Sequence, residues 1–246
     1  MTELLRVGDE FLVNTATLGS QNEPTVTALS NGGFVVSWAD QSGGGVEAGS
    51  VGVKAQVYSA TGVRVGDEFV VATSTQSTQY QPTIAGLSDG GFVVSWADGS
   101  GQGGDPDASI KAQVFSAAGG RIGGEFLVNT VTAGMQQRPT ITGLSDGGFV
   151  VSWQDSSGQG GDASGSGIKA QLFSAAGERI GAEVLVNTAT LNNQGQPTVT
   201  GLSQGGFVVS WTDLSGQGAM RVLQASRRRS SRSQRRIKRL WALTPG

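Results

Sequence analysis

The sequence contains no cysteine and no histidine. Disulfide bonds, thiolate or imidazole metal ligands, cysteine nucleophiles and histidine general bases are therefore excluded. No apolar run approaches the length of a membrane span. The opening MTELLRVGDEF has an acid at position 3 and lacks the apolar segment of a secretory signal peptide. The chemistry open to this chain is thus narrow, and a membrane span is not expected.

What the sequence does contain is repetition. GGFVVSW occurs four times, ending at Trp38, Trp96, Trp153 and Trp211, with spacings of 58, 57 and 58 residues. Each copy follows a Gln-x-x-Pro-Thr segment, and three copies precede KAQ-containing segments such as KAQVFSA. An acidic-aromatic segment such as GDEFVVAT closes the unit, and one further copy, GDEFLVNT, stands alone at residues 8–15. A regular period of this length is typical of stacked repeat architectures.

Each unit contains four strand-like segments. PTVTALS begins behind a proline, GFVVSWAD is nearly continuously apolar, and the segments IKAQVFSA and EFLVNT alternate as half-exposed strands do. An Asp-Gly or Asn-Gly turn joins the first two segments as a hairpin. Forty glycines suit such tight turns. The pattern predicts an all-β β-propeller or propeller-like array, with a tandem β-sandwich or β-solenoid as the alternative.

We expect a repeat domain over residues 1–218, with units near 8–66, 67–123, 124–181 and 182–218, the last of them incomplete. The fourth unit lacks its own EFLVNT segment. Residues 10–15 are therefore expected to complete the last blade as its fourth strand, closing the ring.

Residues 219–246 differ from the body. They carry 9 Lys and Arg and no acid, whereas residues 1–218 carry 8 Lys and Arg against 19 Asp and Glu. If one nucleotide is restored before the codon of residue 219, residues 219–232 can be read as Gly-Asp-Ala-Gly-Ala-Ala-Gly-Ile-Lys-Ala-Gln-Val-Phe-Ser. This is the missing loop and third strand, so we interpret the tail as out-of-frame translation and predict that it is disordered. The alternative is a polybasic arm that binds phosphates without specificity; a selected nucleic-acid function is not expected.

The loop after each Trp is the most polar part of a unit. In DGSGQGGDPD and DSSGQGGD, oxygen-bearing side chains recur between glycines, as in loops that fold around Ca²⁺. The alternative is a solvated hairpin whose Asp and Ser side chains cap turns. The candidate ligands are Asp98, Ser100, Gln102, Asp105, Asp107, Asp155, Ser157, Gln159 and Asp162.

Other repeated residues invite a functional and a structural interpretation. The four Trp residues could stack on sugars, but their place at the end of an apolar strand favours packing between blades. The repeated glutamates Glu10, Glu68, Glu125 and Glu183 could hydrolyse glycosides in pairs, yet a residue repeated in every unit is usually scaffolding. Because the units are nearly uniform, we predict no enzyme activity. A propeller enzyme such as a glycosidase or sialidase-like hydrolase is the alternative.

The consensus PTVTGLSDGGFVVSW…SGQGGD…GIKAQxFSAxGxxIGxEFLVNT, over residues 5–218, resembles the long repeats of large hemolysin-type (RTX-like) calcium-binding proteins that Gram-negative bacteria export. The resemblance implies an extracellular or cell-surface protein with Ca²⁺ as ligand and an uncleaved C-terminal export signal. The glycine-rich nonapeptide run of those proteins is missing. From these residues we expect a non-catalytic module that binds Ca²⁺, a carbohydrate or a protein partner through its loops.

Overall fold

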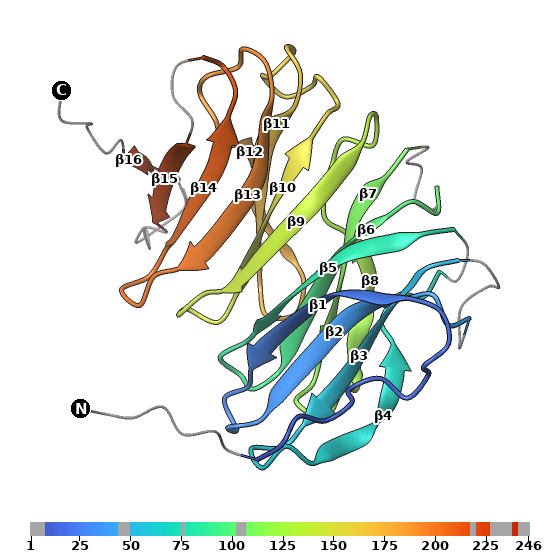
Figure 1. Cartoon of the computed structure of the whole chain (residues 1–246). Coiled ribbons are helices and arrows are strands. Elements are labelled where there is room, and N and C mark those ends of the chain that lie inside the picture. Colours follow the sequence, from blue (N-terminus) through green and yellow to red (C-terminus); the bar gives the residue numbers. More distant parts are fainter. Residues whose placement is uncertain are drawn as a thin grey trace.

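The computed structural model describes residues 8–43, 50–74, 77–101, 107–216 and 220–226, and the backbone of 238–240. Over these residues the chain forms strands and turns and no helix. Four antiparallel sheets follow one another, each built from four consecutive strands (Figure 1). We call them blades 1 to 4. Within the described ranges, no helix has the length and apolarity that a membrane span requires.

The bounds of the strands repeat closely from blade to blade. Blade 1 contains β1 (Gln21–Ala28), β2 (Phe34–Asp40), β3 (Gly52–Tyr58) and β4 (Arg64–Val70). Blade 2 contains β5 (Gln79–Gly86), β6 (Phe92–Asp98), β7 (Ser109–Phe115) and β8 (Arg121–Leu127). Blade 3 contains β9 (Gln136–Gly143), β10 (Phe149–Asp155), β11 (Gly167–Phe173) and β12 (Arg179–Leu185). Blade 4 contains β13 (Gln194–Gly201), β14 (Phe207–Asp213), β15 (Met220–Ser226) and β16 (Lys238–Leu240).

The first hairpin of each blade forms where the sequence predicts it. In blade 2 the Asp89 side chain accepts a hydrogen bond from the Gly91 amide at 3.0 Å, and Gly90 adopts a φ of 96°. The Leu87 amide donates to the Gly91 carbonyl at 2.8 Å and closes the turn. Glycine adopts this left-handed conformation without steric cost, which is why Asp-Gly-Gly ends one strand and starts the next.

The blades stack through their first strands. The inner strands β1, β5, β9 and β13 lie side by side in that order (Figure 1). Their ends approach so closely that a Cβ at Gly143 would lie 2.4 Å from the carbonyl oxygen of Gly86, and one at Gly86 equally close to that of Ala28. The repeated glycine at the end of the inner strand therefore permits the stacking. The prediction of a propeller with four-stranded units is confirmed.

Each blade has two apolar faces, because the second strand is apolar at consecutive positions. We call the face toward the preceding blade the leading face and the opposite one the trailing face. Between blades 1 and 2, Val35 and Val53 of the trailing face pack against Phe92, Val94 and Trp96 of the leading face. The Trp side chains are buried, as are Phe92 and Phe149. The prediction that the Trp residues pack between blades is confirmed for Trp96, Trp153 and Trp211, whereas Trp38 is buried in blade 1, which has no blade before it.

Residues 10–15 do not complete blade 4. The segment runs along blade 1, where the Phe11 ring lies 5.3 Å from that of Tyr58 and the Arg64 guanidinium donates to the Val13 carbonyl at 2.9 Å. Phe69 and Phe126 make the same contact with the following blade, at the same 5.3 Å from Phe115 and Phe173. Residues 11–15 thus contact blade 1 in the same way that the end of the fourth strand of blade 1 contacts blade 2.

The tail also differs from the expectation of disorder where the structure describes it. Met220–Ser226 pair with β14 as β15, with Trp211 opposite Arg221, as Trp153 lies opposite Lys169 in blade 3. The backbone of Lys238–Leu240 pairs with the end of β15. The remainder of 219–246 lies outside the described residues, and the out-of-frame origin of the tail stays a prediction.

Candidate functional site

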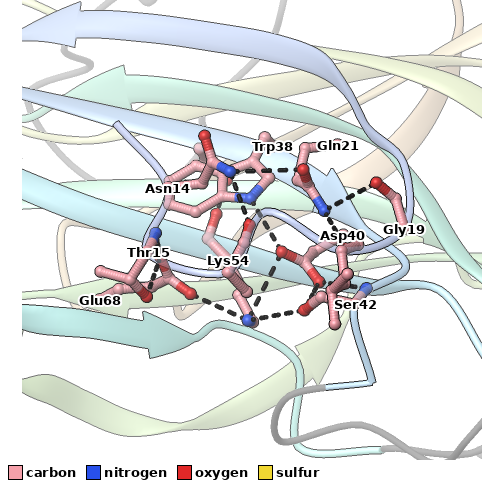
Figure 2. Close-up of polar contacts among 12 residues, drawn as sticks. Asn14, Thr15, Gly19, Gln21, Trp38, Asp40, Ser42, Lys54 and Glu68 are labelled. Atoms are coloured by element: carbon pink, nitrogen blue, oxygen red, sulfur yellow. Dashed lines mark hydrogen bonds and ion pairs between the residues drawn. The ribbon is translucent and has the colours of Figure 1, made fainter. Parts of the chain in front are cut away.

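A buried ion cluster recurs in the first three blades and accounts for most of the repeated charges. In blade 1 the Lys54 ammonium on β3 lies 2.9 Å from Glu68 on β4 and 3.5 Å from Asp40 on β2 (Figure 2). Blade 2 repeats it with Lys111 between Asp98 (2.5 Å) and Glu125 (3.0 Å), and blade 3 with Lys169 between Asp155 (2.7 Å) and Glu183 (2.9 Å). In blade 4, Arg221 pairs with Asp213.

The glutamate of each cluster also binds the chain segment that precedes its own blade. Glu68 accepts hydrogen bonds from the amide and hydroxyl of Thr15 at 2.7 and 3.0 Å (Figure 2). Glu125 accepts the corresponding pair from Thr73, and Glu183 from Thr130. The repeated glutamates Glu68, Glu125 and Glu183 thus have a structural role, each joining its blade to the segment before it, while Glu10 lies exposed outside any strand.

These contacts perturb the acidity of the clustered groups. Burial raises the pKa of Asp40, but hydrogen bonds from Ser42 and Trp38 and the charge of Lys54 outweigh it, so the pKa lies below its usual 3.8. Burial likewise raises the pKa of Glu68, and the contacts with Lys54 and Thr15 bring it below 4.5. Burial lowers the pKa of Lys111, yet its two carboxylate partners raise it above 10.5 overall. The folded state therefore favours the charged form of these groups.

The candidate calcium ligands of blade 2 lie around this cluster. Asp98 ion-pairs with Lys111 and accepts hydrogen bonds from the Ser100 amide (3.1 Å) and hydroxyl (2.8 Å). Asp107 accepts a hydrogen bond from the Gly134 amide at 3.1 Å. Gln102 and Asp105 lie outside the described residues.

Blade 3 shows the same pattern. Asp155 binds Lys169 and Ser157, and the Ser157 hydroxyl accepts from the Gln159 amide at 3.0 Å. Asp162 instead accepts a hydrogen bond from the Asn187 side chain at 2.7 Å. No group of three or more acidic residues suited to a metal ion occurs in the described part of the chain. Calcium binding stays a prediction, and at Asp98 and Asp155 it requires displacing a lysine ammonium.

The repeated Gln and Asn side chains are used internally. Gln136 donates to the Asp155 carboxylate at 3.1 Å and to the Gly134 carbonyl at 2.7 Å. The Asn129 side-chain oxygen accepts from the Ile110 amide at 2.7 Å. Gln79, Gln194 and Asn187 are buried in equivalent positions. The side chains of these five Gln and Asn residues therefore hold strand ends and loops together and do not form a ligand-binding rim.

A different set of polar residues lies on the inner strands. The third residue of each inner strand forms a row, which we call the inner-strand row: Glu23, Gln81, Arg138 and Gln196. All four have a left-handed backbone, with φ between 52° and 54°, at a β-bulge just before the proline. Glu23, Arg138 and Gln196 are exposed and Gln81 is half-buried. Bulges of this kind redirect a side chain and are frequent next to active sites.

Side chains of the row connect neighbouring blades. The Glu23 carboxylate accepts a hydrogen bond from the Gln81 amide at 2.6 Å, and the Gln81 side-chain oxygen accepts from the Arg138 amide at 2.8 Å. The Arg138 guanidinium makes no hydrogen bond or ion pair with a described residue. The other arginines of the first three blades donate to carbonyls of the segment before them, as Arg64 does to Val13 and Arg121 to Val70.

A groove of about 500 Å³ lies at the opposite end of the same inner strands. Thr27, Ile84, Gly86, Ile141 and Thr142 line it, together with adjoining hairpin residues. The residues that line this groove carry no charge, whereas the row contains the charged residues Glu23 and Arg138. The residues of the row occupy the second variable position of Gln-x-x-Pro-Thr, and the residues at the first, such as Tyr80, vary as well. Variation at these two positions of a uniform repeat is the sequence signal that points to this part of the inner strands.

No protein-family model matches the chain, and no curated protein matches its sequence. Its fold is similar to that of a thermostable family-43 glycoside hydrolase, with a TM-score of 0.50 and 12% identity, covering 91% of this chain and 76% of that one. It is also similar to an α-L-arabinanase from Penicillium chrysogenum complexed with arabinobiose (TM-score 0.55, 15% identity, 92% and 68% covered). A third similar structure is the Hadza microbial sialidase Hz136 (0.55, 13%, 83% and 44%).

Two expectations from the sequence are wrong in view of these comparisons. The resemblance to hemolysin-type repeat proteins is not supported by any family model, and the structures that share this fold are glycoside hydrolases and a sialidase. The expectation of a protein without enzyme activity relied on the uniformity of the units. It is overturned because the similar solved structures named above are glycoside hydrolases and a sialidase.

Proposed function

We propose that the chain hydrolyses a glycan that binds along the inner-strand row. The observation that carries this proposal is the placement of Glu23 and Arg138. Charges that repeat from blade to blade are used inside the scaffold, whereas these two do not repeat and project from bulges of the inner strands. The fold shared with glycoside hydrolases supports the same assignment.

The side chains of the row suit distinct tasks. Glu23 has an exposed carboxylate that can exchange a proton with a glycosidic oxygen or with water. The backbone N–H of Gln81 donates a hydrogen bond to this carboxylate at 2.6 Å and holds it in place. Gln81 and Gln196 offer amide groups for sugar hydroxyls. Glycoside hydrolysis usually employs two protein carboxyl groups, but in some families the substrate supplies the second group. Glu23 is the one carboxylate of the described inner strands, which favours a substrate that contributes a group of its own.

Arg138 points to the chemistry of that substrate. Its planar guanidinium has no partner among the described residues and is suited to pair with a carboxylate through two hydrogen bonds. A glycan containing an acidic sugar would place its carboxylate there, two blades away from Glu23. We therefore infer an acidic glycan as the substrate class.

The test is release of reducing sugar by the purified full chain from matched acidic and neutral polysaccharides, a polyuronate, a sialylated glycoprotein and arabinan. Hydrolysis of an acidic glycan is expected. Glu23→Gln should lower the rate by about 100-fold or more while binding is kept, and Arg138→Met should weaken binding of acidic glycans alone. Glu178→Gln, at an exposed hairpin of blade 3, is the matched control. Absence of hydrolysis on all three substrates, or full activity of Glu23→Gln, would refute the proposal.

A further inference from the structure

The leading face of blade 1 is uncovered where the other three leading faces are buried. Val26 on β1 is 64% exposed, whereas Ile84, at the same position on β5, is 7% exposed. Phe34 and Val36 are half-buried, while the equivalent Phe92 and Val94 are fully buried against blade 1. Apolar side chains that the repeat normally buries between blades are thus presented to solvent at the start of the arc.

The trailing face of blade 4 is uncovered in the same way. Met220 on β15 is 78% exposed and Val222 is 63% exposed. The residues at the same positions on β7, Ile110 and Ala112, are fully buried in the core between blades 2 and 3. The row of four blades therefore ends in two different apolar faces, the leading face of blade 1 and the trailing face of blade 4. Faces of these two kinds pack against each other at each of the three interfaces between blades.

The outer edge of blade 4 is incomplete as well. In blade 2 the start of β7 pairs with the end of β8, Lys111 with Leu127 and Ala112 with Phe126. At the corresponding half of β15, no described strand pairs on the side away from β14, because β16 reaches only Gln224 to Ser226. Phe11 and Leu12, which correspond to Phe126 and Leu127 in the repeat, are more than half exposed beside blade 1.

We propose that the trailing face of blade 4 binds a second copy of the chain, whose blade 1 and N-terminal segment supply the missing half of the interface. In this head-to-tail contact, Phe11 and Leu12 of the second copy pair with Val222 and Arg221, in the register of Phe126 and Leu127 on β7. They keep their contact with their own blade 1, because Phe126 serves β7 and the following blade in the same way.

The contact is heterologous, since the two faces belong to opposite ends of the arc. Such contacts close into a ring or continue as a chain, and they never form a symmetric pair through one face. This property separates the proposal from nonspecific association of exposed apolar residues, in which either face associates with its own kind.

The experiment measures molar mass by light scattering during gel filtration of the full chain over a range of concentrations. The wild type is expected to form a dimer or a longer head-to-tail species. Val26→Asp and Val222→Asp should each abolish the assembly, and Ile122→Asp, on the exposed outer strand of blade 2, should leave it unchanged.

Mixing the two disabled variants is the decisive measurement. Val26→Asp keeps a native trailing face and Val222→Asp keeps a native leading face, so the mixture should form a heterodimer with one intact contact. The heterodimer also demonstrates that both variants are folded. A wild type that stays monomeric, or a variant that self-associates alone, would overturn the proposal, whatever the outcome of the glycan assays.

Discussion

Replacing Lys111 by methionine tests whether the buried ion clusters stabilise the blades as the geometry indicates. The ammonium lies within 3.0 Å of carboxylates of Asp98 and Glu125, and all three side chains are at most 10% exposed. Methionine fills a similar volume but leaves two buried carboxylates without their counter-ion. Breaking a buried pair in this way costs about 3–5 kcal/mol, a large part of the roughly 5–15 kcal/mol that stabilises a typical domain.

The assay is urea denaturation at neutral pH, followed by tryptophan fluorescence, because Trp96 is buried next to this cluster in blade 2. The matched control is the triple variant with Asp98→Asn and Glu125→Gln added, which removes all three charges and should recover much of the loss. A loss below about 1 kcal/mol, the scale of an exposed ion pair, would refute the reasoning.

Three further perturbations follow from the structure. Gly143→Ala places a Cβ 2.4 Å from a carbonyl of the preceding blade and should cost about 1–3 kcal/mol in thermal or urea unfolding, whereas Gly124→Ala, with open space around it, should not destabilise. Gln196→Gly relieves a left-handed φ of 54° and should leave stability equal or up to about 1 kcal/mol higher, while glycan binding weakens; a clear loss of stability would contradict the strain. The pKa values of Asp40 and Glu68 in the folded state lie below their usual 3.8 and 4.5. The ionised carboxylates therefore stabilise the folded state above the usual values, and this contribution is lost as the pH falls through the folded-state pKa values. Thermal melts between pH 7 and pH 3 should show stability declining below about pH 4.5.

Much of the fold could be predicted from the sequence because the same local patterns recur from one repeat unit to the next. The Asp-Gly turns, the apolar second strand and the Trp positions agree with one architecture, and consistency of this kind is what specifies a fold. The place of residues 10–15 was predicted only in part. Their likeness to a fourth strand is real, but the sequence contains no information on how far the arc of blades closes, and the contact with blade 1 decides their position.

The candidate site was harder to predict from the sequence than the fold. Lys111, Asp98 and Glu125 lie on three strands, and their pairing depends on the register between β6, β7 and β8. Loops with alternating oxygens therefore suggested calcium, although two of their aspartates are held by lysines. The repeat pattern does not predict the inner-strand row, because the pattern is defined by constant residues and the residues of the row vary.

The backbone of the row is the strongest reason to regard that variation as functional. At all four bulges a residue other than glycine adopts a φ near 53°, at a cost of about 1 kcal/mol or more each. Glycine would remove this cost, and glycine occupies the other left-handed positions of the described residues except Ser77 and Asn192. The four units instead carry Glu, Gln, Arg and Gln there. The side chains of Glu23 and Gln81 accept a hydrogen bond from the next blade, but that contact does not require the charges of Glu23 and Arg138. A strained position that holds Glu in one blade, Arg in another and Gln in two is explained if the side chains contact a ligand that is itself asymmetric, as a glycan chain is.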